Sequence, residues 1–320
     1  MLGKLLTLAA LLFLGLVSAS RAADDLHMVV DDAWSGATGV HFSGRLTEVR
    51  TAPENRHGKL RTFYHTSRLL ITSGETGSVT WRVTGHEWSL RTDDDGYWNL
   101  SANPSPVLAP GWHEIESAPA ISSPAGLLVI DPRNRFGIIS DIDDTIMVSH
   151  VVQTRTLLKN SLTVPPSRRD PVTGMASLYR RLLAINPAPE SAALFYVSSS
   201  PRQLTDNLRG FLRHNAFPRG VLRLKELSDA SDHSLFEQRD YKRHEIEAVL
   251  RSYPHMRFAL FGDDGEYDPE IYAELQKNFP AQIAGVWIRR VNPNPQRARF
   301  PDQADTAALL ASPNPAAALD

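Results

Sequence analysis

The chain has 320 residues, of which 42% are hydrophobic, and a formal net charge of -2 at pH 7. This composition is that of an ordinary globular protein, and the length is enough for two domains of about 100–200 residues each. The near-neutral charge excludes a general attraction to nucleic acid, so an anionic ligand must bind at a local site. The chain has no cysteine, which excludes disulfides and a lipid anchor attached through cysteine.

The first 22 residues have the pattern of a secretory signal peptide. Lys4 supplies a positive start, residues 5–17 (LLTLAALLFLGLV) are apolar, and small residues around Ala22 form a cleavage site. The apolar run is short for a transmembrane helix, although an uncleaved anchor is the alternative. We therefore expect an exported protein, in the periplasm or outside the cell.

Residues 23–133 have the pattern of a small all-β domain. Short strands are expected at 40–46, 67–72, 78–83, 87–91 and 97–100. Turn signals separate them, and one of these, Asp95-Gly96, is typical of a β-hairpin. Several short strands joined by turns predict a β-sandwich. Five of the six tryptophans lie in this half; we expect them in its core, with an exposed aromatic binding face as the alternative.

Between residues 134 and 292, apolar strands alternate with amphipathic helices. Strands are expected at 136–140, 193–198, 220–224, 257–262 and 284–288, and helices at 175–184, 202–214, 243–251 and 269–278. This alternation predicts an α/β fold, a doubly wound parallel sheet with helices on both faces. Residues 293–320 are rich in proline and alanine, and we expect them to form a loosely ordered tail.

Acidic or hydroxyl residues stand where three of these strands end: Asp141, Asp143, Asp144, Ser198, Asp263 and Asp264. In a doubly wound sheet, ligands bind in the crevice outside the carboxyl ends of the strands. Carboxylates crowded into one crevice repel each other, and a cation would offset that repulsion. Because Mg²⁺ prefers oxygen ligands, it is the natural candidate.

The motifs follow one another in a fixed order: DIDDT at 141–145, SSSP at 198–201, Lys242, and GDDGEYD at 262–268. In this order they resemble the haloacid-dehalogenase (HAD) superfamily. More closely, ISDIDDTI, FYVSSSP, GDDGEYDPEIY and WIRRV are similar to the catalytic domain of the actin-patch-associated phosphatidate phosphatases and their bacterial relatives. The resemblance covers roughly residues 136–291, and TDDDGYW and GWH in the first half resemble the β-domain of bacterial members.

The resemblance implies an Mg²⁺-dependent phosphatase in which five residues have catalytic roles. Asp141 attacks phosphorus and forms an aspartyl-phosphate. Asp143 protonates the leaving oxygen and then takes a proton from the hydrolytic water. Thr145 orients the nucleophile loop or the phosphate, Ser198 donates a hydrogen bond to the phosphoryl oxygens, and Lys242 neutralises phosphate charge.

The implied metal ligands are Asp141, the backbone carbonyl of Asp143, and Asp263. Most relatives have serine at position 264, where this chain has Asp264, so the sequence leaves open whether Asp263 acts alone or with its neighbour. Asp144 is expected to cap a helix or to support the site from outside.

Two residue pairs have the pattern of a helix N-cap followed by proline. Ser200-Pro201 is expected to begin the helix at 202–214, and Asp268-Pro269 is expected to begin the helix at 269–278. Asp268 is also a candidate for supporting the site from outside the metal ligands.

The substrate implied by the resemblance is phosphatidate, which would give diacylglycerol and phosphate. One alternative is a phosphatase of another monoester, such as a sugar, nucleotide or phosphoprotein. Another is a non-catalytic protein that binds lipid or glycan on the same scaffold. Six basic residues between Arg202 and Lys225 are expected on a solvated face, with contact to an anionic membrane surface as the alternative. No nucleic-acid partner is expected.

Overall fold

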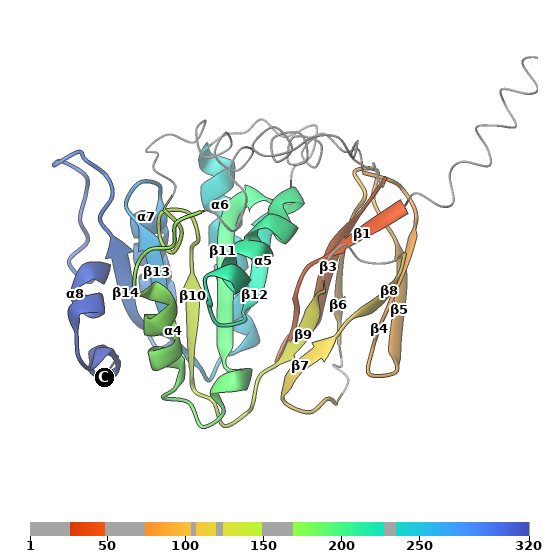
Figure 1. Cartoon of the computed structure of the whole chain (residues 1–320), viewed down its shortest axis with the longest axis horizontal. Helices are drawn as coiled ribbons and strands as arrows, with labels where there is room; N and C mark the ends of the chain where they lie inside the picture. The colour runs from red at the N-terminus through yellow and green to blue at the C-terminus, as the bar shows by residue number, and fades with distance from the viewer. Residues whose placement is uncertain are drawn as a thin grey trace, which may run out of the picture.

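A computed structural model gives the structure of the chain and describes residues 26–48, 74–103, 107–119, 124–148, 169–226 and 235–319. The predicted signal peptide and the strand expected at 67–72 lie outside these residues. Within the described residues, an all-β part is followed by an α/β part that packs beside it (Figure 1). No helix in the described part of the chain has the length and apolar character that crossing a membrane requires.

The first part contains two sheets. The larger sheet consists of β1 (Leu26–Val30), β2 (Ala33–Gly36), β3 (Gly39–Glu48), β6 (Tyr97–Ala102), β7 (Gly111–Glu114) and β9 (Gly126–Val129). The smaller sheet consists of β4 (Ser78–Val83), β5 (His86–Arg91) and β8 (Glu116–Ala118). Neighbouring strands are antiparallel, except for the parallel pair of β2 and β9.

Residues from both sheets fill one apolar core. Phe42 and Leu46 of the larger sheet pack there with Val79 and Trp81 of the smaller one. Trp81 also stacks on Trp98, with the ring centroids 4.5 Å apart. Two sheets that share a core in this way have the architecture of a β-sandwich. Trp81 and Trp98 are thus core residues, as the sequence predicted for the tryptophans of this half.

The second part is a parallel sheet covered by helices. Its strands are β10 (Phe136–Ser140), β11 (Ala193–Pro201), β12 (Val221–Lys225), β13 (Arg257–Asp263), β14 (Ile283–Arg289) and β15 (Ala304–Asp305). Its helices are α4 (Met175–Leu183), α5 (Thr205–His214), α6 (Leu235–Ser252), α7 (Asp268–Asn278) and α8 (Thr306–Ala311), with short 3-10 helices η2 (Pro189–Ser191), η3 (Arg202–Leu204) and η4 (Pro315–Ala318). The α/β class predicted from the sequence is confirmed.

The inner strands of this sheet have continuous apolar runs, at 193–197 in β11 and 258–261 in β13, because both faces are buried. Ile138 packs with residues of α4, α5 and α8, whereas Ile139 packs with residues of α6 and α7. Leu194 and Phe195 of the next strand divide between the two faces in the same way. Successive side chains of a strand point to opposite faces, so a continuous apolar run is what a parallel sheet buried on both sides requires.

The order of the strands, β12-β11-β10-β13-β14-β15, reverses at the centre of the sheet. The chain runs outward from β10 through β11 to β12, and it then returns to the other side of β10 with β13 and β14. β10 and β13 pair in parallel although they are far apart in the sequence. Ligands bind at the carboxyl ends of the strands at such a reversal, and these two strands lead directly to Asp141 and Asp263.

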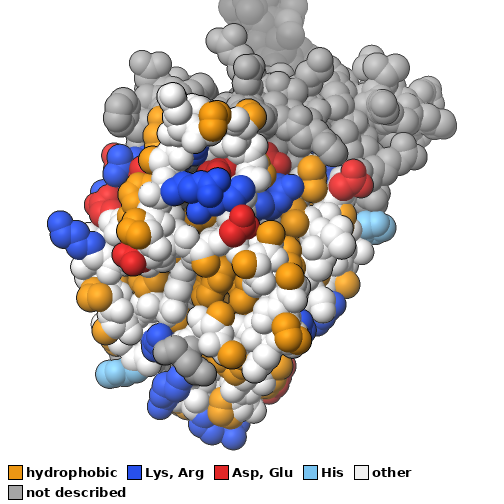
Figure 2. Space-filling view, turned by 90° about the vertical axis from the view of Figure 1, so that its left-hand side faces the viewer, with side chains coloured by type: hydrophobic (Ala, Val, Ile, Leu, Met, Phe, Trp, Pro, Cys, Tyr) orange, Lys and Arg blue, Asp and Glu red, His pale blue; other side chains and the backbone are white. Residues whose placement is uncertain are grey.

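The C-terminal segment differs from the loosely ordered tail that the sequence predicted. β15 pairs with β14, and the Asp305 side chain accepts a hydrogen bond from the backbone N–H of Ala307 at the start of α8. Leu309 and Leu319 are buried in the core beside α4, so they help to anchor a segment rich in proline and alanine. The face on this side of the molecule shows apolar side chains in its middle and a group of Lys and Arg side chains above them (Figure 2).

The two parts of the chain share an apolar interface. Trp34 of β2 and Leu128 of β9 belong to the same buried cluster as α6 and one face of the parallel sheet. The Trp34 ring stands edge-on to Phe195, with centroids 5.8 Å apart, and its Nε1 donates to Ser252 Oγ at 3.4 Å. The larger β-sheet is therefore packed directly on the second part.

Three of the six basic residues between Arg202 and Lys225 do not lie on the solvated face that the sequence favoured, whereas Arg213 and Arg219 are exposed as expected. Arg202, Arg209 and Arg223 are 2%, 7% and 6% exposed. All three lie against the first part of the chain, and Arg219 covers the ring of Trp112 at 4.0 Å. The three buried arginines are accordingly closed to contact with a membrane surface as well.

Candidate active site

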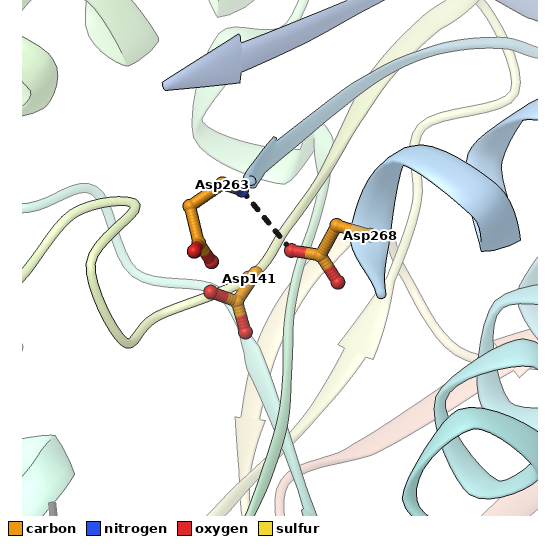
Figure 3. Close-up of side chains that lie close together, drawn as sticks. All are labelled: Asp141, Asp263 and Asp268. Carbon is orange, nitrogen blue, oxygen red and sulfur yellow. Dashed lines mark hydrogen bonds between the residues drawn. The ribbon is translucent and has the colours of Figure 1, made fainter. Parts of the chain in front are cut away.

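Three buried carboxylates meet where the strand order reverses (Figure 3). Asp141 follows β10, Asp263 ends β13 and Asp268 begins α7, and each places an oxygen within 4.8 Å of the other two. The backbone N–H of Asp263 donates to Asp268 Oδ2 at 3.2 Å. This hydrogen bond folds the turn after β13 back on itself and brings Asp268 to the other two acids.

Lys242 of α6 provides a cation inside this cluster. Its Nζ donates to Asp141 Oδ1 at 2.9 Å and to Asp268 Oδ1 at 2.5 Å, and its side chain is only 3% exposed. Burial opposes the charge of Lys242, but Asp141 and Asp268 outweigh burial and hold its pKa well above the ordinary value. Lys242 is therefore a permanent positive charge against Asp141.

One ammonium group does not balance three carboxylates. Burial, followed by the charges of Asp268 and Asp141, raises the pKa of Asp263 well above its ordinary value. Burial also raises the pKa of Asp268 to about 6, and that of Glu266 in the same turn to about 7. Carboxyl groups behave in this way when negative charge is crowded in a place that water solvates poorly. The cluster is thus set to take up positive charge.

The residues of the cluster fit a divalent metal ion. Asp141 Oδ2 is buried and has no hydrogen-bond partner among the described residues. An unpaired buried carboxylate oxygen is costly, and an ion would satisfy it. Three carboxylates also offer the hard oxygen donors that divalent cations such as Mg²⁺ prefer. Asp141, Asp263 and Asp268 would hold the ion.

Asp143 lies beside the cluster and is held by two hydroxyl groups. Ser198 Oγ donates to Asp143 Oδ2 at 3.1 Å, and Ser200 Oγ donates to the same oxygen at 2.9 Å. Burial, and then the charge of Asp141, raises the pKa of Asp143, whereas the two serine hydrogen bonds lower it. Since the net pKa shift is upward, Asp143 retains a proton more readily than an ordinary aspartate.

Ser200 was expected to cap a helix, and the structure corrects this expectation. β11 continues to Pro201, a short 3-10 helix follows, and α5 begins only at Thr205. Ser198 and Ser200 are two residues apart in a strand, so both point to the side where Asp143 lies. That spacing was the available signal, but the pattern of serine before proline obscured it.

Asp264 was expected to contribute to the metal site, and the structure places its side chain elsewhere. Asp264 Oδ1 accepts hydrogen bonds from the backbone N–H groups of Val291, at 2.6 Å, and Asn292, at 2.8 Å. Adjacent residues at a strand end point in different directions, so Asp264 organises the loop after β14 while Asp263 faces the cluster. Asp268 supplies the third carboxylate.

The remaining residues of the nucleophile loop form a tight turn. Asp144 has a left-handed backbone conformation, with φ of 54°, and its carbonyl accepts from Arg289 Nη1 at 2.6 Å. It supports the turn instead of capping a helix. Thr145 is buried, and its hydroxyl has no hydrogen-bond partner among the described residues. The orienting role expected of Thr145 stays a prediction.

The part of the chain that forms this site is similar to a known family. Residues 136–290 match the model of the family described as phosphatidate phosphatase APP1, catalytic domain. The chain is 31% identical over 154 residues to phosphatidate phosphatase APP1 of Saccharomyces cerevisiae, covering 48% of this chain and 25% of that protein. It is 29% identical over 160 residues to an uncharacterised protein of Schizosaccharomyces pombe, covering 50% of this chain and 26% of that protein. The chain thus spans about a quarter of the length of these relatives.

Among solved structures, a carbohydrate acetylesterase from Xanthomonas citri aligns with a TM-score of 0.27 and 10% identity, over 83% of this chain and 68% of that chain. A likeness this low has no bearing on the fold. The family match spans all the residues of the site: Asp141, Asp143, Ser198, Ser200, Lys242, Asp263 and Asp268.

Proposed function

Residues 136–290 belong to the family of the phosphatidate phosphatase APP1 catalytic domain, a phosphoric monoester hydrolase, and on this premise we propose that the protein hydrolyses a phosphomonoester through an aspartyl-phosphate on Asp141. The observation that carries the proposal is the arrangement around Asp141. A buried lysine holds one of its oxygens, the other oxygen is unpaired, and a protonatable Asp143 lies beside it.

The chemistry takes two steps. In the first, an Asp141 oxygen bonds to phosphorus while the bond from phosphorus to the leaving oxygen breaks, and Asp143 gives its proton to that oxygen. In the second, water attacks the phosphorus and passes a proton to Asp143, which frees Asp141 and releases phosphate. The upward shift in the pKa of Asp143 supports this assignment, because a carboxyl group that keeps its proton more readily than an ordinary aspartate is better suited to act as an acid.

The charges around Asp141 suit a phosphoryl group. Lys242 is fixed against Asp141 and offers its ammonium to the phosphoryl oxygens. Mg²⁺ held by Asp141, Asp263 and Asp268 would neutralise phosphoryl charge and so lower the barrier to transfer. Ser198 donates to Asp143 in the free protein, and rotation of its hydroxyl would let it donate to a bound phosphate instead.

The finer assignments rest on the fold and on the relatives. The strand order and the acids at the strand ends support a fold of the haloacid-dehalogenase type. The name of the yeast relative supports phosphatidate as the substrate, with diacylglycerol and phosphate as products. The pattern of the first 22 residues supports export, which would place the enzyme in the periplasm or outside the cell.

A phosphate-release assay on a panel of esters tests the proposal. The panel contains phosphatidate in mixed micelles, a sugar phosphate, a nucleotide and a phosphopeptide, each with Mg²⁺ and with EDTA. We expect the highest kcat/KM on phosphatidate with Mg²⁺, no release in EDTA, and none from Asp141→Asn. Equal rates on the soluble esters would exclude the lipid assignment. Wild-type rates from Asp141→Asn would exclude the aspartyl-phosphate mechanism.

A further inference from the structure

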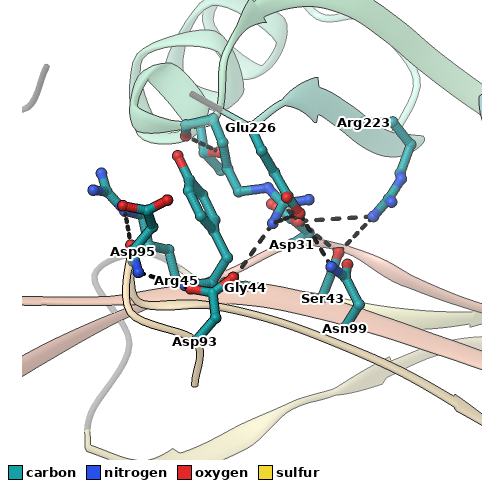
Figure 4. A network of polar contacts seen from close by, with 12 residues as sticks. Asp31, Ser43, Gly44, Arg45, Asp93, Asp95, Asn99, Arg223 and Glu226 are labelled. Atoms are coloured by element: carbon teal, nitrogen blue, oxygen red, sulfur yellow. Dashed lines mark hydrogen bonds and ion pairs between the residues drawn. The ribbon is translucent and has the colours of Figure 1, made fainter. Parts of the chain in front are cut away.

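Asp31, between β1 and β2 in the first part of the chain, is a buried carboxylate with partners from the second part. Its side chain is 1% exposed, and its Oδ2 accepts a hydrogen bond from Ser43 Oγ at 2.6 Å (Figure 4). The same oxygen forms ion pairs with Arg202 Nε at 3.1 Å and with Arg223 Nη1 at 3.7 Å. A buried charge is stable only when it is paired in this way, so the contact fixes the groups around it.

Arg202 connects Asp31 to the end of β11 that carries the active-site serines. It comes directly after Pro201, two residues beyond Ser200. Its Nη1 also pairs with Glu226 Oε1 at 3.0 Å and donates to the Gly44 carbonyl at 3.4 Å. The guanidinium is therefore held from several sides, and the backbone that leads back to the serines is held with it.

Arg223 connects the same carboxylate to α6, the helix of Lys242. Its Nε donates to Glu245 Oε2 at 2.7 Å, and its Nη1 donates to Ser43 Oγ at 2.6 Å. Glu245 lies three residues after Lys242 and so stands one helical turn along from it. Two elements that supply groups to the site are thus connected to Asp31: β11 through Arg202, and α6 through Arg223.

We propose that Asp31 is a positioning residue of the active site, which fixes the end of β11 through Arg202 so that the Ser200 hydroxyl holds Asp143 toward the leaving oxygen. This inference rests on the proposed phosphatase function and gives the β-sandwich part a role in it. Without the charge of Asp31, Arg202 shifts toward its remaining partners, Glu226 and the Gly44 carbonyl, and the serines shift with the backbone.

The test is Asp31→Asn in the full-length chain, assayed on p-nitrophenyl phosphate and on the best alkyl ester of the panel. Because kcat/KM reports the transfer of phosphate to Asp141, it depends on protonation of the leaving oxygen by Asp143. An alkoxide needs that proton, whereas p-nitrophenolate leaves without it. We expect kcat/KM for the alkyl ester to fall about 10- to 100-fold, and that for p-nitrophenyl phosphate less than about threefold.

Asp32→Asn is the matched control. Asp32 Oδ2 pairs with Arg209 Nη2 at 3.4 Å in the same buried interface, but Arg209 belongs to α5 and lies several residues beyond the serines. Loss of this ion pair weakens the interface without touching the end of β11. We expect Asp32→Asn to keep the wild-type ratio of the two kcat/KM values.

The outcomes separate this inference from the function on which it rests. If the wild-type protein hydrolyses neither ester, the proposed function fails and the inference with it. If the wild type is active and Asp31→Asn loses both activities equally, or neither, only the inference is overturned. If circular dichroism shows that Asp31→Asn does not fold, Arg202→Lys takes its place. It keeps the charge but loses the forked geometry, so a selective loss on the alkyl ester supports the inference and an equal loss overturns it.

Discussion

Replacing Asp263 by asparagine tests the electrostatics of the carboxylate cluster. The amide keeps the size of the side chain, and its oxygen can still accept the hydrogen bond that Gly265 N–H donates to Asp263 Oδ1 at 2.7 Å. The change removes one of three negative charges that share the single ammonium of Lys242. It therefore relieves two repulsions, one with Asp141 and one with Asp268.

The size of the effect follows from the geometry. One carboxylate oxygen of each acid in the cluster lies within 4.8 Å of those of the other two. At that largest separation, each repulsion between two carboxylates amounts to about 3 kcal/mol at an effective dielectric constant of about 20. Protonation offsets part of this repulsion, because burial and neighbouring charge raise the pKa of both Asp263 and Asp268. We expect a net gain of about 1–2 kcal/mol in the free energy of unfolding of the metal-free protein. This corresponds to a rise of roughly 2–6 °C in Tm.

Thermal unfolding in EDTA measures the stability of the metal-free protein, and thermal unfolding in saturating MgCl₂ measures how much the ion adds to it. The wild-type protein should gain stability from Mg²⁺, by about 2.7 kcal/mol when the free ion is at a hundred times its Kd. Asp263→Asn should melt at a higher temperature than the wild type in EDTA and gain little from Mg²⁺. The reasoning is refuted if the variant melts below the wild type in EDTA, or if Mg²⁺ stabilises the two proteins equally.

Four further predictions follow from the site. Asp141→Asn should lower kcat by roughly 10⁴-fold or more in a phosphate-release assay, because no other side chain replaces the nucleophile. Ser198→Ala removes a hydrogen bond that lowers the pKa of Asp143, so the alkaline limb of the kcat/KM profile should move to higher pH. Asp264→Ala should destabilise the protein by about 1–3 kcal/mol in chemical denaturation, because two backbone N–H groups lose their acceptor, and it should leave the response to Mg²⁺ intact. The affinity for Mg²⁺ in calorimetric titrations should fall below about pH 6, where Asp268 becomes protonated and competes with the ion.

The sequence predicted the central strands and the acids behind them because both signals are local. An apolar run that ends in a carboxylate marks a buried strand and its functional end, and the structure has β10 at Phe136–Ser140 and β13 at Arg257–Asp263. Knowledge of the strand order was not needed, since the carboxyl ends of parallel strands lie on one edge of the sheet whatever their order. Asp141 and Asp263 are brought together for this reason.

Side-chain direction in the loops was harder to predict because it depends on backbone turns that residue types do not specify. Asp263 and Asp264 are residues of the same type, but only Asp263 faces the cluster. The turn that follows brings Asp268 back to the cluster. Ser200 has the pattern of a helix cap, yet the strand runs on and directs its hydroxyl to Asp143.

The buried arginines lay beyond any local signal. Arg202 and Arg209 belong to a segment that the sequence predicts to be an amphipathic helix, in which basic residues usually face water. Their carboxylate partners, Asp31 and Asp32, come from the other part of the chain, far away in the sequence. These side chains are buried only because the two parts of the chain pack together. A prediction from the local sequence therefore places them on the surface.

The apolar contact of Trp34 and Leu128 with the second part has a consequence for synthesis of the chain. Both residues emerge from the ribosome before Phe195 and α6, and N-terminal segments generally fold first. Until the later residues arrive, the newly formed sheets expose a tryptophan and a leucine that the finished protein covers. The nascent chain therefore passes through a stage with exposed apolar surface. A chaperone or rapid completion of translation would protect it from aggregation at that stage.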